Sequence, residues 1–107
     1  MIKISRIVDN NVDNNVTYEI YINNILLDKL ENGECKSFRL KTGENYKMVI
    51  KNKDKVSNEI IFNMDSDQVI EFECGPIYGK TFFSNFSKNK KYVNHRIKLV
   101  IAKDFHL

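Results

Sequence analysis

The residues best suited to chemistry in this sequence are cations near its C-terminal end. Five Lys or Arg residues lie within positions 88–98, beside a tyrosine. Clustered cations neutralise phosphates, and an exposed aromatic ring can stack on a base, so this composition suits a nucleic acid or another anionic partner. Because lysine is abundant throughout the chain, a solvated surface without a partner is the alternative. The candidate residues are Lys88, Lys90, Lys91, Tyr92, Arg96 and Lys98.

Patterns for catalysis or metal binding are weaker. Cys74 and His95 could form a nucleophile and its base, but Cys74 is in phase with two apolar strand residues, which is typical of an inert packing group. Segment 9–15 places oxygen side chains at alternate positions, as a calcium loop does. However, Asn14 stands where such a loop needs glycine, and Ile20 stands where it needs a bidentate glutamate. We therefore expect no catalytic, cofactor or metal site.

Charge is distributed unevenly along the 107 residues, whose net charge is +3. Residues 1–74 carry 10 Lys or Arg against 13 Asp or Glu, whereas residues 75–107 carry 7 against 1. The C-terminal third, 75–107, is therefore the basic part of the chain.

Composition also bears on the origin and location of the protein. Lys, Asn and Ile fill 41 of the 107 positions, a bias that AT-rich genomes produce, so we expect a source in a low-GC bacterium or a virus of one. Charged residues near the N-terminus stand where a signal peptide needs an apolar core, and no apolar run is long enough to cross a bilayer. We expect a cytoplasmic protein without a membrane span.

Apolar and polar residues alternate with period two in most of the chain, which predicts half-buried β-strands. Turn residues such as Asn32-Gly33 separate these runs at regular intervals. The pattern predicts one domain, 1–107, folded as an antiparallel β-sandwich of seven or eight strands. Segment 75–91 does not show this alternation. Its phenylalanines stand at helical spacing and predict either one short helix near 80–88 or a structured loop. The expected strands cover about 2–8, 16–23, 25–30, 37–41, 46–51, 59–64, 70–74 and 97–102.

The phase of each strand predicts which side chains share the core. Tyr18, Phe38, Phe62 and Phe72 each occupy the apolar phase of a strand, so we expect them in one core. Ile97, Leu99 and Ile101 form the apolar phase of the last strand. Of the two cysteines, Cys74 is in the apolar phase and Cys35 is out of phase, so we expect different environments and no disulfide bond.

A skeleton of turn and core positions runs through the middle of the chain. It comprises a Tyr-x-Ile-x-Ile strand at 18–22, an Asn-Gly-Glu turn at 32–34, a Phe-x-Leu strand at 38–40, a Gly-x-x-Tyr turn at 43–46, Ser-Asn at 57–58 and Phe-x-Cys at 72–74. In this skeleton, residues 16–74 resemble a small β-sandwich module of low-GC bacteria that is related to PEGA-type and carboxypeptidase-regulatory-like domains. The resemblance implies a sandwich fold and carries no activity.

These observations lead to a functional hypothesis with two alternatives. The hypothesis is a non-enzymatic β-sandwich that binds another macromolecule, foremost a protein, through a sheet edge or the basic third. A virus-encoded inhibitor of a host factor is one specific form of it. The first alternative is a nucleic-acid or other anionic-ligand binder that uses segment 88–98. The second is a small enzyme without a recognisable motif, in which His95 or Cys74 would line a cleft.

Overall fold

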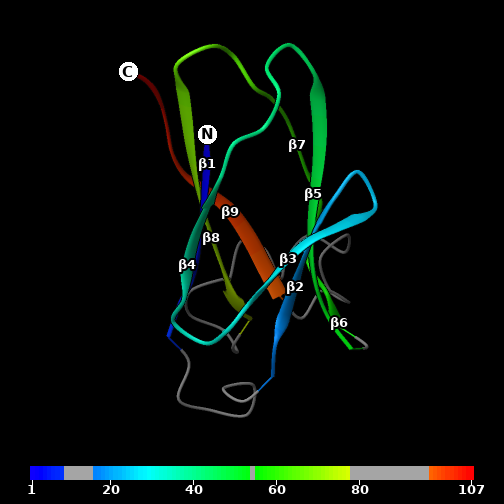
Figure 1. Cartoon of the computed structure of the whole chain (residues 1–107). Helices are drawn as coiled ribbons and strands as arrows, with labels where there is room; N and C mark the ends of the chain where they lie inside the picture. Colours follow the sequence, from blue (N-terminus) through cyan, green and yellow to red (C-terminus); the bar gives the residue numbers. More distant parts are fainter. Residues whose placement is uncertain (9–15, 54, 78–96) are drawn as a thin grey trace, which may run out of the picture.

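A computed structural model of the chain describes residues 1–8, 16–53, 55–77 and 97–107. These residues form nine strands and no helix, arranged as two packed sheets (Figure 1). The all-β sandwich expected from the alternation is thus confirmed, whereas the short helix expected near 80–88 lies outside the described residues. The strands are β1 (Ile2–Arg6), β2 (Tyr18–Ile22), β3 (Ile25–Leu30), β4 (Cys35–Phe38), β5 (Asn45–Asn52), β6 (Lys55–Val56), β7 (Ile60–Asn63), β8 (Gln68–Pro76) and β9 (Ile97–His106).

Each sheet has a simple strand order. The first sheet runs β4-β1-β8-β9, and the second runs β3-β2-β5-β6, with β7 also paired to β5. All pairs are antiparallel except β1 and β8, which run parallel with Ile2 opposite Ile70 and Ile4 opposite Phe72. The expectation of antiparallel pairing is therefore wrong for this one pair. Strand β1 lies between β4 and β8, which are distant from it in the sequence, and no tight turn fixes the direction of its pairing with β8.

The core between the sheets is built from alternate strand positions. Tyr18 and Phe72 are fully buried, Phe62 is nearly so, and Phe38 packs half-buried against the same cluster. The ring of Phe62 lies between those of Tyr46 and Phe72, with centroids 5.6 and 5.1 Å away in the tilted geometry that aromatic pairs prefer. The predicted shared aromatic core is confirmed.

The buried Arg6 ties the first sheet to the second at the end of β1. Its guanidinium lies 3.7 Å from the centroid of the Tyr18 ring, and its Nη1 donates a hydrogen bond to the carbonyl oxygen of Leu30 at 3.0 Å. Only 2 % of Arg6 is exposed. A buried cation needs such contacts to offset its lost hydration, so they hold Arg6 between the ends of β1, β2 and β3.

Two elements depart from the expected alternation or boundaries. In the β8–β9 pair the register shifts between Glu71 and Phe72, so Ala102 has no opposite residue, and the strand extends to His106. Ile101 is 43 % exposed, so its expected place in the core is wrong. No strand is expected between 51 and 59, whereas the short strand β6 forms there at Lys55–Val56. The described residues contain no helix able to cross a membrane.

The two cysteines occupy the different environments that their phases predict. Both are free thiols; Cys35 is exposed, whereas Cys74 is buried in the core. Burial raises the pKa of the Cys74 thiol to about 12, so this group stays protonated at neutral pH. A protonated, enclosed thiol is a poor nucleophile.

Thiol titration tests this difference. At about pH 8, one thiol per folded chain should react rapidly with a chromogenic disulfide reagent, since the thiolate is the reacting form. Cys35→Ser should abolish the rapid reaction, and denaturant should release the slow thiol. Two rapidly reacting thiols in the folded protein would contradict the burial of Cys74.

Truncation of the core aromatic tests the sandwich itself. Phe72→Ala should lower the free energy of unfolding by about 3 to 5 kcal/mol, because it removes a fully buried ring and leaves a cavity. The matched control is Phe105→Ala on the partly exposed end of β9. Urea unfolding should show a much smaller loss for this control, and equal midpoints for the two variants would refute the assignment of the core.

Candidate binding site

A break in the strand pairing shapes the outer face of the second sheet. On one side, β5 pairs with β6 at Lys51 and Asn52, and pairing with β7 resumes at Met48. Between these points a single serine completes the ladder: the amide of Ser57 donates to the oxygen of Ile50, and the amide of Ile50 donates to the Ser57 hydroxyl, both at 2.8 Å. The backbone amide and carbonyl of Ile50 are therefore both hydrogen-bonded, although no continuous strand runs beside them.

The residue after this serine joins the two sheets. The side-chain amide of Asn58 donates to the carbonyl oxygen of Leu99 at 2.8 Å and accepts from the Leu99 amide at 2.9 Å. Ser57 also bridges to Ile97 of β9. Ser57 and Asn58 are buried and make these hydrogen bonds to Ile50 and Leu99. The chain between β6 and β7 therefore turns inward and leaves the outer face open beside β5.

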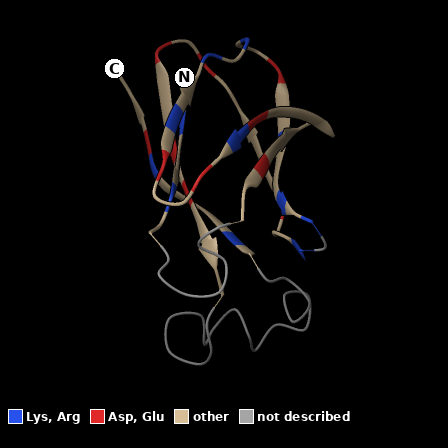
Figure 2. Cartoon of the chain, turned by 60° about the horizontal axis from the view of Figure 1, so that its bottom comes forward, with Lys and Arg blue, Asp and Glu red and all other residues tan. Residues whose placement is uncertain are grey.

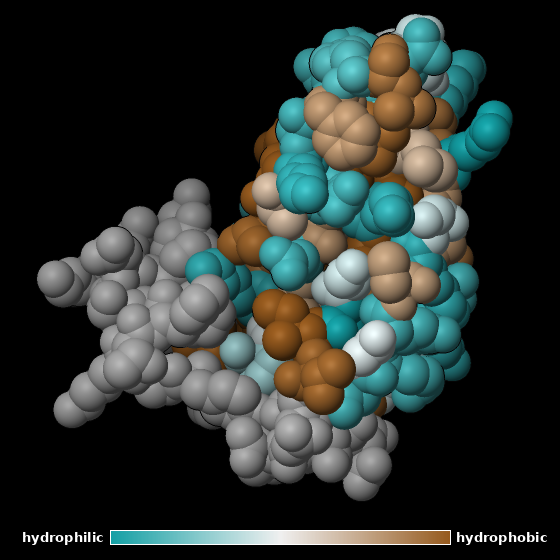
Figure 3. All heavy atoms as spheres, turned by 90° about the vertical axis from the view of Figure 1, so that its left-hand side faces the viewer, coloured by the Kyte–Doolittle hydropathy of each residue, from teal (hydrophilic) through white to brown (hydrophobic). Residues whose placement is uncertain are grey.

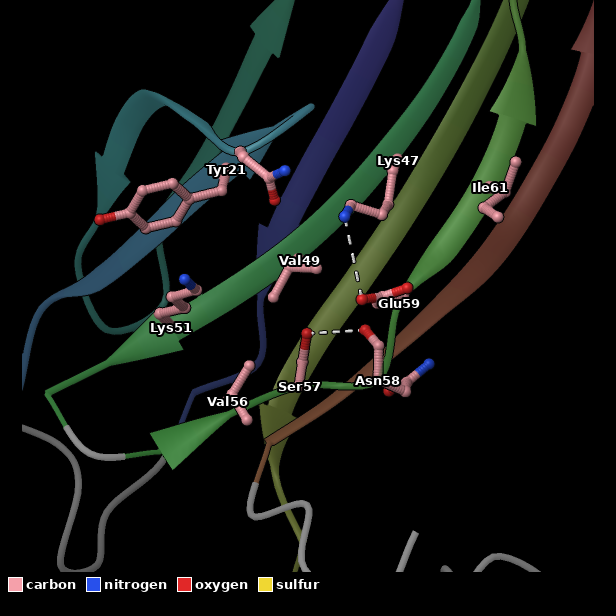
Figure 4. A pocket seen from close by; sticks show the side chains of 10 residues that line it. Tyr21, Lys47, Val49, Lys51, Val56, Ser57, Asn58, Glu59 and Ile61 are labelled. Carbon is pink, nitrogen blue, oxygen red and sulfur yellow. Dashed lines mark hydrogen bonds and ion pairs between the residues drawn. The ribbon is translucent and has the colours of Figure 1, made fainter. Parts of the chain in front are cut away.

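The result is a hollow of about 530 Å³ on the outer face of the second sheet, which we call the binding hollow (Figure 4). Val49 lines it from β5, at the outward position directly opposite Tyr21 of β2. Val56 and Ile61, from β6 and β7, line it on the other side of β5. Ile61 is 73 % exposed, which is unusual for a large aliphatic side chain on a strand.

Two lysines of β5, Lys47 and Lys51, line the binding hollow. The Lys51 ammonium lies 4.7 Å from the centroid of the Tyr21 ring, and the Lys47 ammonium lies 4.0 Å from a carboxylate oxygen of Glu59. The second contact is a long ion pair between partly exposed groups and contributes little to stability. The exposed Lys53, in the hairpin between β5 and β6, lines a separate hollow with Glu19 and Lys29; Figure 2 shows how the basic and acidic positions are distributed over the strands.

The outer face of the first sheet carries alternating charges. There Lys3 of β1 lies opposite Glu71 of β8, which in turn lies opposite Lys103 of β9, so charges alternate across three strands. In a view from this side, apolar atoms form separate groups among polar ones (Figure 3). Charges alternate in the same way across β3, β2 and β5 of the second sheet, where Lys29 lies opposite Glu19 and Glu19 opposite Lys51, so the feature that distinguishes the hollow is its apolar border.

Most residues of the site predicted from sequence cannot be placed. Lys88, Lys90, Lys91, Tyr92 and Arg96 lie outside the described residues, as does His95, so an anion-binding segment at 88–98 stays a prediction. Lys98 is half-buried between the buried Ile97 and Leu99, in the expected alternation, and it pairs with Gly75 of β8. Burial lowers the pKa of Lys98. The described residues contain no group of three or more metal-ligating side chains.

The sequence reasoning missed the binding hollow, although a signal for it exists. Val49 and Ile61 are apolar residues in the polar phase of their strands, next to Met48, Ile50 and Ile60 in the apolar phase. Apolar residues on both faces of a strand that flanks a sheet edge indicate a second contact surface.

No protein-family model, curated protein or solved structure matches this chain. The resemblance of residues 16–74 to PEGA-type modules therefore stays a prediction, and function is argued from the surface alone.

The two hydrogen bonds between the Asn58 side chain and the Leu99 backbone, which we call the Asn58 clamp, predict that truncation of Asn58 lowers stability. In Asn58→Ala, the backbone groups of Leu99 lose both hydrogen bonds in a buried setting, where each unsatisfied group costs about 1 to 3 kcal/mol. We expect a loss of about 2 to 4 kcal/mol in urea unfolding. The control, Asn63→Ala on the exposed side of β7, should change stability by less than about 0.5 kcal/mol. Equal stabilities of the two variants would show that the clamp is dispensable.

Proposed function

We propose that this protein is a non-enzymatic binding module whose partner is another protein and whose contact surface is the binding hollow. The observation that carries the proposal is the exposed apolar border of the hollow, formed by Ile61 and Val56, which lie across β5 from the Tyr21 ring. Exposed apolar side chains near an aromatic ring and rimmed by charges are typical of protein interfaces.

The chemistry of the described residues supports binding over catalysis. The described cysteine in the core, Cys74, has a thiol whose pKa burial raises to about 12, which leaves it unsuited to attack a substrate. The one described histidine, His106, lies 3.6 Å from Asp65 near the end of β9, and neither residue lines the hollow. A hollow that is open on a sheet face also suits a macromolecular surface better than a small substrate, which is usually enclosed.

A protein partner is favoured over a nucleic acid by the kind of residues in the hollow. Val49, Val56 and Ile61 offer aliphatic surface, which suits apolar side chains, whereas bases stack on exposed aromatic rings. The ring of Tyr21 already has the Lys51 ammonium above it. Phosphate recognition also favours arginine for bidentate contacts, and the cations in the hollow are lysines.

The expected location and origin fit this proposal. A cytoplasmic module that covers a surface of another protein through one sheet face acts by occlusion and needs no reactive group. An inhibitor of a host factor, encoded by a virus of a low-GC bacterium, would be one such protein.

Two variants with nearly equal exposure test the proposal. Peptides are selected on the parent protein from a random displayed library, and their affinities are then measured for Ile61→Glu and Ile25→Glu. Ile61 and Ile25 are 73 % and 72 % exposed, but Ile25 lies at the start of β3 outside the hollow. Ile61→Glu should weaken binding about tenfold or more, because it places a charge on the apolar border, and Ile25→Glu should not.

Three outcomes oppose the proposal. One is a failure to select any binding peptide. Another is an equal effect of the two variants, which would place the peptides elsewhere. The third is displacement of the peptides by a mixed-sequence oligonucleotide at about 50 mM salt, which would assign the hollow to a nucleic acid.

A further inference from the structure

We infer that the binding hollow takes an extended acidic segment, which lies along β5 with two carboxylates four positions apart and an apolar side chain midway between them. This inference rests on the proposed function and adds the chemistry and spacing of the partner.

The spacing comes from three successive outward positions of β5. Lys47, Val49 and Lys51 point to the same side of the sheet, since side chains on a strand alternate between faces. Each step of two residues covers about 6.6 Å, so the two lysine positions are about 13 Å apart, with Val49 between them. An extended peptide repeats with the same step. Its residues i, i+2 and i+4 can therefore meet these three positions together.

Both lysines can accept a carboxylate at little cost. Lys47 has only the 4.0 Å pair with Glu59, which a closer carboxylate replaces without loss of a strong contact. Lys51 lies over the Tyr21 ring, and a cation held over a ring keeps ammonium hydrogens for an anion on its other side. The ring also limits the positions of the lysine side chain, which lowers the entropy lost on binding.

The middle of the hollow suits an aliphatic side chain. Val49 is only 7 % exposed although it points outward, so the surrounding side chains already form walls around it. Tyr21 stands on one side of β5 and Ile61 on the other, as Figure 4 shows. An apolar residue placed over Val49 would contact the ring of Tyr21 directly opposite and would approach Ile61 diagonally, because Ile61 lies opposite Lys47; these contacts provide the hydrophobic part of the affinity.

The local charge favours an acidic partner. Among the described residues that line the hollow, Lys47 and Lys51 stand against one carboxylate, Glu59, and Glu19 of β2 lies directly opposite Lys51. The lining residues thus carry a surplus of a single positive charge, which favours an acidic segment over a basic one.

On two of the edge strands, β3 and β9, side chains occupy backbone groups that an added strand would need. On the edge strand β3, the amide of Lys29 donates to the Asp28 carboxylate at 2.7 Å, and its carbonyl accepts from Lys36 at 2.8 Å. On β9, Asn58 occupies both backbone groups of Leu99. Strand addition is blocked at these positions, so the open face is a better surface than either of these two edges.

Two capped peptides of identical composition test the inference. The first, Thr-Glu-Thr-Leu-Thr-Glu-Thr, has the required spacing, and the second, Thr-Thr-Glu-Glu-Leu-Thr-Thr, does not. Titrations followed by amide NMR shifts at about 50 mM salt should show at least about fivefold tighter binding of the first peptide. The shifts should centre on Val49 and Tyr21, and binding should weaken at roughly 300 mM salt because the contacts are ionic.

Matched lysine variants complete the design. Lys51→Gln should remove most of the preference for the first peptide. Lys103→Gln on the first sheet changes the net charge equally, and it should leave the preference intact. Ile25→Glu serves as the folding and charge control used above.

The outcomes separate this inference from the proposed function. Equal binding of the two peptides would overturn the spacing, and equal effects of the two lysine variants would overturn the role of β5. If neither peptide binds while library peptides bind in an Ile61-dependent manner, the acidic partner is wrong and the proposed function stands. If library peptides also fail, both proposals fall.

Discussion

A buried side-chain amide must find hydrogen-bond partners, and both polar groups of Asn58 find theirs on the backbone of Leu99. This contact draws the chain between β6 and β7 inward toward the edge of the first sheet. It leaves Ser57 to complete the pairing of Ile50, and it leaves the outer face beside β5 uncovered. The join between the sheets and the hollow on one of them are thus two results of the same pair of hydrogen bonds.

A polar side chain also joins the sheets at the end of β1. Arg6 of the first sheet reaches the carbonyl of Leu30 in the second and packs on the ring of Tyr18. Arg6, Cys74 and Leu99 lie opposite one another across β1, β8 and β9, so both polar contacts are at one level of the first sheet, and the core of aliphatic and aromatic side chains extends from there along the strands. Hydrophobic burial drives the sheets together, but it is non-directional, whereas Asn58 and Arg6 each require a particular partner. Their geometry fixes how the sheets align.

The sequence predicted the features that depend on local chemistry. Tyr18, Phe62 and Phe72 belong to one core because strand alternation is written into each segment separately. The same alternation says nothing about which strand pairs with which, so the parallel contact of β1 with β8 was not foreseen. Ile101 was misplaced although it lies opposite the buried Phe72, because alternation predicts the face of a side chain and not whether the other sheet covers that position. The hollow was missed because Asn58 reads as a turn residue until its partner on β9 is known.

The central position of β1 in the first sheet has a consequence for the order of folding. The amino group of Met1 donates to the carbonyl of Gln68, across 67 positions of the chain, and β1 then pairs along β8. During synthesis, β1 emerges long before its parallel partner exists, so its apolar side chains stay without their final neighbours until β8 has left the ribosome. Closing so long a loop lowers the entropy of the chain before any stabilising contact forms between β1 and β8. Sheets with such high contact order fold on the millisecond to second scale. We therefore expect the first sheet to assemble late, around a strand that is synthesised before both of its partners.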